Sequence, residues 1–249
     1  MVLACDIGNS RIKAGIFEDN FLTKVFVCSS ISVLIEFITS HRIKKVAISS
    51  VVPANSNEMQ DVLYNQGIIP FIISKDSLFN LSIDYNSPET LGIDRICSAE
   101  GAYFLNKQKR VLRKNHIIIS IDFGTATTLN LVTYPGVFSG GIIAPGVDLM
   151  FRSLSKETAQ LPLVYQNDYK NIIGKSTRES IASGVMNSVA GLLDRSLKLI
   201  KDELDPEKIY IYVTGGNFEL MKPFLGFRYN YKEALVLYGV KAIFDKNKL

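Results

Sequence analysis

The feature that most constrains this chain is a pattern that occurs twice, in which an apolar stretch ends at Asp-x-Gly and a second apolar stretch follows. Residues 2–5 run into Asp6-Ile7-Gly8-Asn9-Ser10, and residues 12–17 come next. Residues 117–121 run into Asp122-Phe123-Gly124-Thr125, and residues 127–133 come next. Short apolar runs bounded by turn residues are typical of strands. We therefore expect two related halves that each open with a strand, a turn and a strand.

The rest of the chain alternates between strand-like and helix-like segments. Further strands are predicted at residues 22–28, 45–51, 68–73, 137–141 and 209–213. Helices are predicted at residues 33–39, 55–65, 92 to about 105, 177–204 and 232–244. This mixture predicts a layered α/β fold. Residues 106–115 are polar and basic, so we expect them to separate an N-terminal domain, residues 1–115, from a C-terminal domain, residues 116–249.

Composition limits the classes of protein to which this chain can belong. Of its 249 residues 47% are hydrophobic, which is enough to bury a core, and the net charge of +4 does not by itself indicate nucleic-acid binding. Cys5, Cys28 and Cys97 form no close pair, which argues against a disulfide framework and a Cys-x-x-Cys zinc site. No apolar run approaches the roughly 20 residues of a membrane span, and the N-terminus does not read as a signal peptide. We expect a cytoplasmic protein that does not bind membranes.

The two acidic turns have the chemistry of a polyphosphate site. Glycine lets the backbone approach phosphate closely, and a carboxylate such as Asp6 suits magnesium that is held through water and phosphates. Lys13 adds a positive charge. A single copy fits an ordinary hairpin turn equally well, but two copies that face each other can hold ATP from both sides. Gly215-Gly216, directly after a predicted strand, offers a third turn against which adenosine can lie.

Two acidic glycine turns and a late Gly-Gly resemble the actin-like ATPase and sugar kinase superfamily. This resemblance implies a duplicated actin-like (ribonuclease H-like) fold with two mixed-sheet domains and a central ATP cleft. Between the turns stands Gly92-Ile93-Asp94-Arg95. Together with residues 6–10, 122–125 and Ser176-Thr177, it resembles the motif series of type III pantothenate kinases. Two positions differ from the common pattern of that family, Ser10 in place of threonine and Ile93 in place of alanine.

The resemblance implies a kinase that phosphorylates pantothenate with ATP in the first step of coenzyme A synthesis. It implies that Asp94 is the general base and that Arg95 binds the pantothenate carboxylate, for which a guanidinium fork is suited. The substrate-binding residues implied are Tyr85, Gly92, Ile93, Asp94, Arg95 and Thr177. The ATP-binding residues implied are Asp6, Ile7, Gly8, Asn9, Ser10, Arg11, Ile12, Lys13 and Thr125.

The resemblance also implies the cofactors and the assembly. ATP would be used with Mg²⁺, which Asp6 meets through water, and Asp122 would hold a monovalent cation, K⁺ or NH₄⁺. A homodimer is implied, with the substrate site near its interface. Each residue has a simpler interpretation when it is taken alone: Asp94 and Arg95 as a surface ion pair at a helix start, Tyr85 as packing, and Thr177 as a helix cap.

Other functions are compatible with parts of the pattern. Another small-molecule kinase of the superfamily would share the phosphate turns, but the motif at residues 92–95 argues against it. A non-catalytic ATP-binding regulator is possible on the same fold, because fold does not fix function. Asp6 and Asp94 are both present, which favours an enzyme. A nucleic-acid module would rest on residues 107–114 alone, which lack a recognised reader motif.

Overall fold

The first half of the chain builds a five-stranded sheet. The computed structural model describes residues 1–8 and 11–248, with the backbone alone at residues 53–56. Strands β1 (Val2–Ile7), β2 (Ile12–Glu18) and β3 (Phe21–Cys28) form an antiparallel meander. β4 (Val46–Ser50) and β5 (Phe71–Ile72) then extend the sheet in parallel with β1, which gives the order β3-β2-β1-β4-β5.

The second half repeats this topology. β7 (His116–Phe123), β8 (Ala126–Thr133) and β9 (Val137–Pro145) form a meander, and β10 (Lys208–Thr214) and β11 (Asn230–Tyr231) extend the sheet in parallel with β7. A sixth strand, β6 (Ser82–Ile83), pairs with β9 at the far edge. The equivalent strand order in the two sheets confirms the predicted duplicated actin-like fold.

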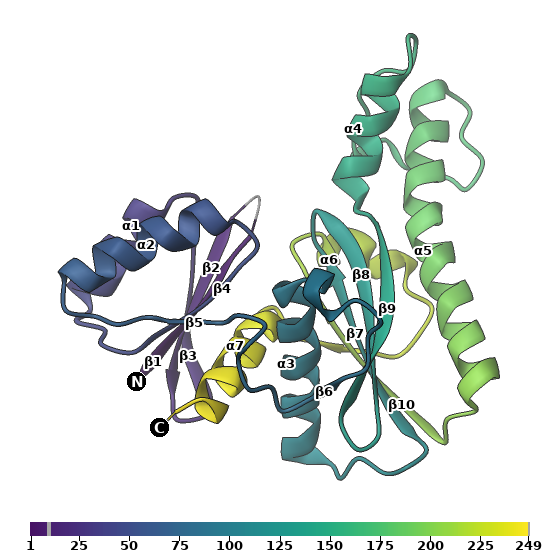
Figure 1. Ribbon diagram of the computed structural model, residues 1–249. Helices are drawn as coiled ribbons and strands as arrows, with labels where there is room; N and C mark the ends of the chain where they lie inside the picture. The colour runs from purple at the N-terminus through teal and green to yellow at the C-terminus, as the bar shows by residue number, and fades with distance from the viewer. Residues whose placement is uncertain (9–10, 249) are drawn as a thin grey trace.

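Helices separate and cover the two sheets (Figure 1). α1 (Ile31–Ser40) and α2 (Pro53–Asn65) cover the outer face of the first sheet. α4 (Val147–Glu157), α5 (Thr177–Leu204) and α6 (Phe218–Met221) pack on the outer face of the second, and α4 and α5 project beyond it as an arm. α3 (Ile93–Lys109) and α7 (Leu235–Lys246) lie between the sheets. Short 3-10 turns occur at Pro88–Thr90, Gln166–Asp168 and Lys222–Phe224.

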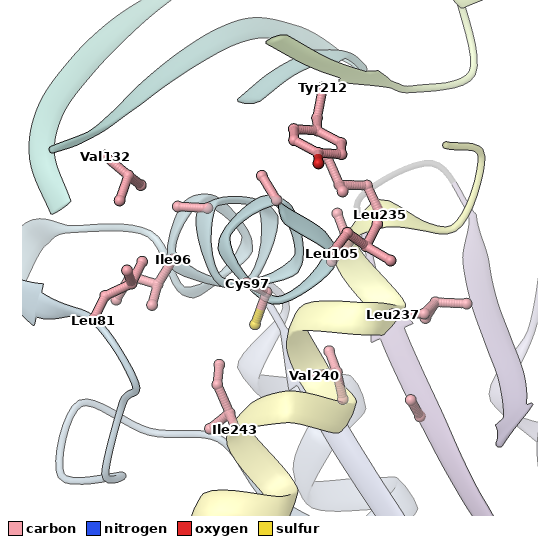
Figure 2. Close-up of a cluster of buried hydrophobic side chains, with 14 of the residues drawn as sticks. Leu81, Ile96, Cys97, Leu105, Val132, Tyr212, Leu235, Leu237, Val240 and Ile243 are labelled. Atoms are coloured by element: carbon pink, nitrogen blue, oxygen red, sulfur yellow. The ribbon is translucent and has the colours of Figure 1, made fainter. Parts of the chain in front are cut away.

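The contact between α3 and α7 forms the centre of the molecule (Figure 2). Side chains from α3, α7 and both sheets share one buried cluster, which includes Cys97, Val132 and Val240. Gly239 fits directly against the backbone carbonyl of Cys97, where a Cβ atom would overlap it. The two helices therefore pack backbone to backbone, which fixes the first turn of α3 relative to both sheets.

Most of the predicted elements are present with small differences in length. The long helix is confirmed at Thr177–Leu204, and the closing helix begins at Leu235 instead of residue 232. The predicted strand at 68–73 is only two residues long. The polar and basic residues 106–115 are predicted to separate two domains, but the first four of them belong to the last turn of α3.

The proposed domain boundary between residues 115 and 116 stays a prediction. The two sheets divide close to it, yet β6 from the first half pairs in the second sheet, and α7 from the second half packs on β1. Asn106, at the start of the predicted linker, is buried within α3 and accepts a hydrogen bond from the Tyr212 hydroxyl at 3.5 Å. No helix in the described part of the chain is long and apolar enough to cross a membrane.

Candidate active site

A cleft of about 560 Å³ lies where the two sheets face each other across the ends of their first strands. Both acidic turns, the first turn of α3 and the late glycine turn contribute to its walls. This arrangement is the central cleft that the sequence predicts. Its lining residues include Asp6, Gly8, Arg11, Lys13, Asp94, Asp122, Gly124, Thr125, Thr128, Asp148, Tyr165, Thr214, Gly215, Gly216 and Asn217.

The first acidic turn brings a carboxylate and an ammonium group to the same face of the sheet. Asp6 and Lys13 are directly opposite each other in the β1–β2 ladder, so their side chains point the same way. The Gly8 N–H donates to the Arg11 carbonyl at 3.2 Å and closes the turn. Lys13 reaches across the cleft, where its Nζ donates to the Glu233 carbonyl at 3.4 Å.

Two other residues of the predicted ATP loop, Ile7 and Ile12, are placed differently. The side chains of Ile7 and Ile12 are buried in the core of the first sheet, so only their backbone is available to a ligand. Asn9 and Ser10 lie outside the described residues. The loop therefore meets the cleft through the side chains of Asp6, Arg11 and Lys13 and through Gly8.

The second acidic turn has the same construction. Asp122 faces Thr128 in β8 and Thr214 in β10, and all three residues line the cleft. Gly215 follows with φ of 109°, a backbone conformation that glycine adopts at low cost. The Arg11 guanidinium lies against Gly216. If Gly216 carried a Cβ atom, that atom would lie 3.2 to 3.3 Å from the Nη1, Cζ and Nη2 atoms of Arg11. Arg11 thus connects the first phosphate turn with the late glycine turn.

Three carboxylates and a single lysine dominate the electrostatics of the cleft floor. Burial, together with the charges of Asp122 and Asp94, raises the pKa of Asp6 to about 7. Burial also raises the pKa of Asp122 to about 6, a rise that Asp94 adds to and Lys13 opposes. Ionising these side chains is therefore costly until a cation joins them.

The described residues contain no group of three His, Cys, Asp or Glu side chains that could hold a metal ion unaided. A divalent ion at this site would have to take its remaining ligands from phosphate and water. Magnesium suits such a site, because it keeps several waters and commonly binds one or two carboxylates together with substrate phosphates. Asp6 and Asp122 on the cleft floor are carboxylates that suit this type of binding, although Arg11 and Arg152 also line the cleft.

Asp94 enters the cleft from the first turn of α3, where Gly92 is the residue that precedes the helix. An acidic residue is favoured at a helix N-terminus, so the local sequence supports this placement. Ile93 packs beside the central hydrophobic cluster, which accounts for its bulk without placing it in the cleft. Of the Gly92–Arg95 motif, Asp94 alone is among the cleft-lining residues.

Arg95 is buried next to Asp94, with an exposed fraction of 5%, and it has no carboxylate partner among the ion pairs of the described residues. Its Nε donates to Asn130 Oδ1 at 2.8 Å and its Nη1 donates to the Tyr85 hydroxyl at 3.4 Å. Its guanidinium also lies 5.6 Å from the centre of the Phe138 ring. Nη2 has no hydrogen-bond partner. A buried cation with an unused donor is equipped to receive an anion.

Thr177 is not brought together with the other predicted substrate residues. It is the first residue of α5 and lines a separate groove on the α4–α5 arm, with Leu154, Lys175 and Ile181 among its neighbours. The preceding Ser176 caps the helix by accepting the Glu179 N–H at 3.2 Å. A contact between Thr177 and the substrate bound at Asp94 of the same chain is therefore not supported by this geometry.

Sequence reasoning missed one wall of the cleft. Asp148, Arg152 and Tyr165 come from α4 and the segment that follows it, and no motif marked them. Asn217 Nδ2 donates to Asp148 Oδ2 at 3.0 Å and so fastens α4 to the late glycine turn. Two signals were available: Asn217 directly follows Gly215-Gly216, and the helical spacing of the apolar residues in 147–154 could have predicted the helix that carries Asp148 and Arg152.

The fold and the paired phosphate turns define a protein of the actin-like ATPase and sugar kinase class. A hexokinase of the ROK family from Thermus thermophilus aligns over 99% of both chains with a TM-score of 0.51 and 12% identity. A protein from Campylobacter jejuni described as a Baf family transcriptional activator aligns over 99% of this chain and 98% of its own, with a TM-score of 0.63 and 22% identity. At these identities, the likeness establishes the fold alone.

The family follows from the sequence comparisons. The model of the type III pantothenate kinase family matches residues 2–198. A type III pantothenate kinase from Legionella pneumophila (strain Corby) is 33% identical over 231 residues, which cover 87% of this chain and 88% of the relative. The chain belongs to the type III pantothenate kinase family.

Proposed function

We propose that this protein transfers the γ-phosphoryl group of ATP to the 4′-hydroxyl of pantothenate, the first step of coenzyme A biosynthesis. Membership of the family supports the substrate. The observation that carries the proposal is the single cleft into which Asp6, Asp94 and Asp122 all face. Phosphoryl transfer asks mainly for positioning and neutralisation of charge, and such a cleft supplies both.

Asp94 acts as the general base in this proposal. The pantothenate hydroxyl oxygen forms a bond to the γ-phosphorus as the bond from phosphorus to the β,γ-bridging oxygen breaks. The hydroxyl proton passes to the Asp94 carboxylate, and ADP leaves. Asp94 is suited to this role because it lies on a helix that is held against both sheets, in the cleft that contains the two phosphate turns.

Arg95 and Tyr85 bind the carboxylate end of pantothenate. The support is the buried guanidinium with its unused Nη2 and the Tyr85 hydroxyl at 3.4 Å from Nη1. A carboxylate at Nη2 would give this cation the counter-charge that no described side chain provides. Asp94 and Arg95 both lie in the first turn of α3, so one rigid helix would fix the base relative to the group that binds the carboxylate.

The polyphosphate of ATP lies between the two acidic turns. Gly8, Lys13 and Thr125 contact it, and Arg11 meets the nucleotide where its guanidinium now lies against Gly216. Asn9 and Ser10 remain predicted members of this loop. Asp6 would hold Mg²⁺ through water and Asp122 would hold K⁺ or NH₄⁺. These cations supply positive charge that offsets the charges of the phosphates and carboxylates.

The enzyme is proposed to act as a homodimer in the cytoplasm. The α4–α5 arm projects away from the second sheet, and Ile172 and Ile173, which precede α5, expose 63% and 75% of their surface. A second copy that covers this arm would bury both isoleucines. Thr177, which lies on the same arm, would then be close to the substrate site of the other copy. The three free cysteines fit a reducing compartment. Light scattering on the purified protein tests the dimer, and a monomer at micromolar concentration would contradict it.

The test of the function is ADP release by the purified protein with ATP, Mg²⁺ and K⁺, in which pantothenate is compared with sugars and short carboxylic acids. We expect strong stimulation by pantothenate alone, together with 4′-phosphopantothenate in the product mixture. Stimulation by a sugar would indicate another kinase of the same fold. If nucleotide binds but no compound stimulates turnover, the protein is an ATP-binding regulator and the proposal is wrong.

A further inference from the structure

Asp148 and Asn217 lie where α4 meets the second phosphate turn and the late glycine turn. Asp148 is the second residue of α4, and the residue before that helix, Gly146, donates its N–H to the Thr125 carbonyl of the second phosphate turn at 2.9 Å. Asn217 directly follows Gly215-Gly216, and its N–H donates to the Phe123 carbonyl at 2.9 Å. Both side chains line the cleft.

The hydrogen bond between these two side chains leaves acceptors unused. Asn217 Nδ2 donates to Asp148 Oδ2 at 3.0 Å. Among the described residues, no hydrogen bond engages Asp148 Oδ1 or Asn217 Oδ1, so the pair presents two acceptor oxygens and a negative charge. Such a pair would repel phosphate and attract a group with two adjacent donors. In a nucleotide, the two ribose hydroxyls are such a group, and the ribose lies between the phosphates and the base.

We propose that Asp148, supported by Asn217, accepts hydrogen bonds from the 2′- and 3′-hydroxyls of the bound nucleotide. This assignment rests on the proposed use of ATP in the cleft, and it identifies the ligand class as a ribonucleotide. Asp148 also suits the first turn of α4 electrostatically, and its bond to Asn217 fastens that helix to the glycine turn. The experiment must therefore separate a contact with ribose from a purely structural bond.

The experiment compares ATP with 2′,3′-dideoxy-ATP as phosphoryl donors in wild type and in Asp148→Ala. We expect wild type to prefer ATP by about tenfold in kcat/KM, the size expected when charge-assisted hydrogen bonds are lost at a partly solvated site. Asp148→Ala should accept both donors within twofold of each other. Glu157→Ala removes the same charge from the exposed end of α4 and should keep the preference of wild type.

Three results would overturn the assignment. Wild type that uses both donors equally would show that the hydroxyls are not recognised. An equal loss with both donors in Asp148→Ala, with the preference retained, would make the bond to Asn217 structural. If Asp148→Ala loses the discrimination between ATP and inosine triphosphate, and keeps that between ATP and the dideoxy donor, Asp148 contacts the adenine ring and not the ribose. Failure of the proposed function is distinct, since wild type would then show no pantothenate-dependent turnover with any donor.

Discussion

Replacing Arg95 by Met should weaken pantothenate binding strongly while it leaves the stability of the fold nearly unchanged. The variant loses the 2.8 Å bond to Asn130, which leaves Asn130 Oδ1 without a donor at a cost of about 1–3 kcal/mol. It also removes a buried charge that has no carboxylate partner, together with the Nη2 group that has no hydrogen-bond partner. Removing both should stabilise the variant by a similar amount. Since Met keeps the apolar stem, we expect a net change within about 1 kcal/mol, or roughly 2–4 °C in Tm.

The effect on pantothenate should be much larger. Truncating one partner of a buried, hydrogen-bonded charge pair costs about 2–4 kcal/mol, which corresponds to a rise of roughly 30- to 700-fold in the KM for pantothenate. The KM for ATP should change less than threefold. Steady-state kinetics and a thermal melt measure both effects. Pantothenol, which carries an alcohol in place of the carboxylate, is the matched substrate: wild type should discriminate against it and Arg95→Met should not.

The reasoning is refuted if Arg95→Met keeps the KM of wild type for pantothenate, or if it keeps the discrimination against pantothenol. A fall of more than about 10 °C in Tm with unchanged KM would make Arg95 a structural cation that holds Asn130 and Tyr85 in place. Arg95→Lys should rescue little, because a point charge does not reproduce the guanidinium fork.

Three further predictions follow from the cleft and the core. Asp122→Ala should lower kcat/KM at least tenfold and abolish the response to a K⁺ titration; an unchanged response would remove the cation assignment. Because the raised pKa of Asp6, about 7, makes the protonated form the stable one, its contribution to stability is full below about pH 4 and is lost as pH rises through 7. Asp6→Asn should therefore raise the free energy of unfolding of the ligand-free protein at pH 8 by up to about 4 kcal/mol, and by much less at pH 5, in urea titrations; an equal gain at both pH values would contradict the pKa argument. Gly239→Ala should lower Tm by several degrees, because its Cβ would overlap the Cys97 carbonyl, whereas Gly191→Ala, on an open face of α5, should stabilise by about 0.5–1 kcal/mol; similar melts for both variants would contradict the backbone packing of α3 against α7.

The elements that the sequence predicted well are those whose pattern is local. The strands that lead into Asp6 and Asp122 are apolar runs, and their duplicated order predicted both sheets. β6 was not predicted because a strand of two residues has no periodicity. The segment before it is held by a bond to a distant residue, since the Glu100 carboxylate accepts the Leu81 N–H at 2.9 Å. α4 was missed although Val147, Met150, Phe151 and Leu154 recur at helical spacing and pack in one buried cluster, so its local pattern could have predicted this helix.

The same distinction applies to the site. Residues at the ends of first strands, such as Asp6 and Asp122, could be predicted because strand and turn chemistry place them. Asp148 is held in the cleft by a hydrogen bond from Asn217, which lies 69 positions away in the sequence. No local sequence pattern encodes that contact. Thr177 was predicted from a motif, but the long helix carries it to a separate groove.

The most direct test of the central claim is turnover of pantothenate by Asp94→Asn. The variant should bind ATP as wild type does in calorimetry and melt within a few degrees of it, while kcat falls at least 100-fold, as expected when a general base is lost. Asp202→Asn, an exposed position in the last turns of α5, serves as the matched control and should keep full activity. Near-normal turnover by Asp94→Asn would contradict the account of this cleft as the site where pantothenate is phosphorylated.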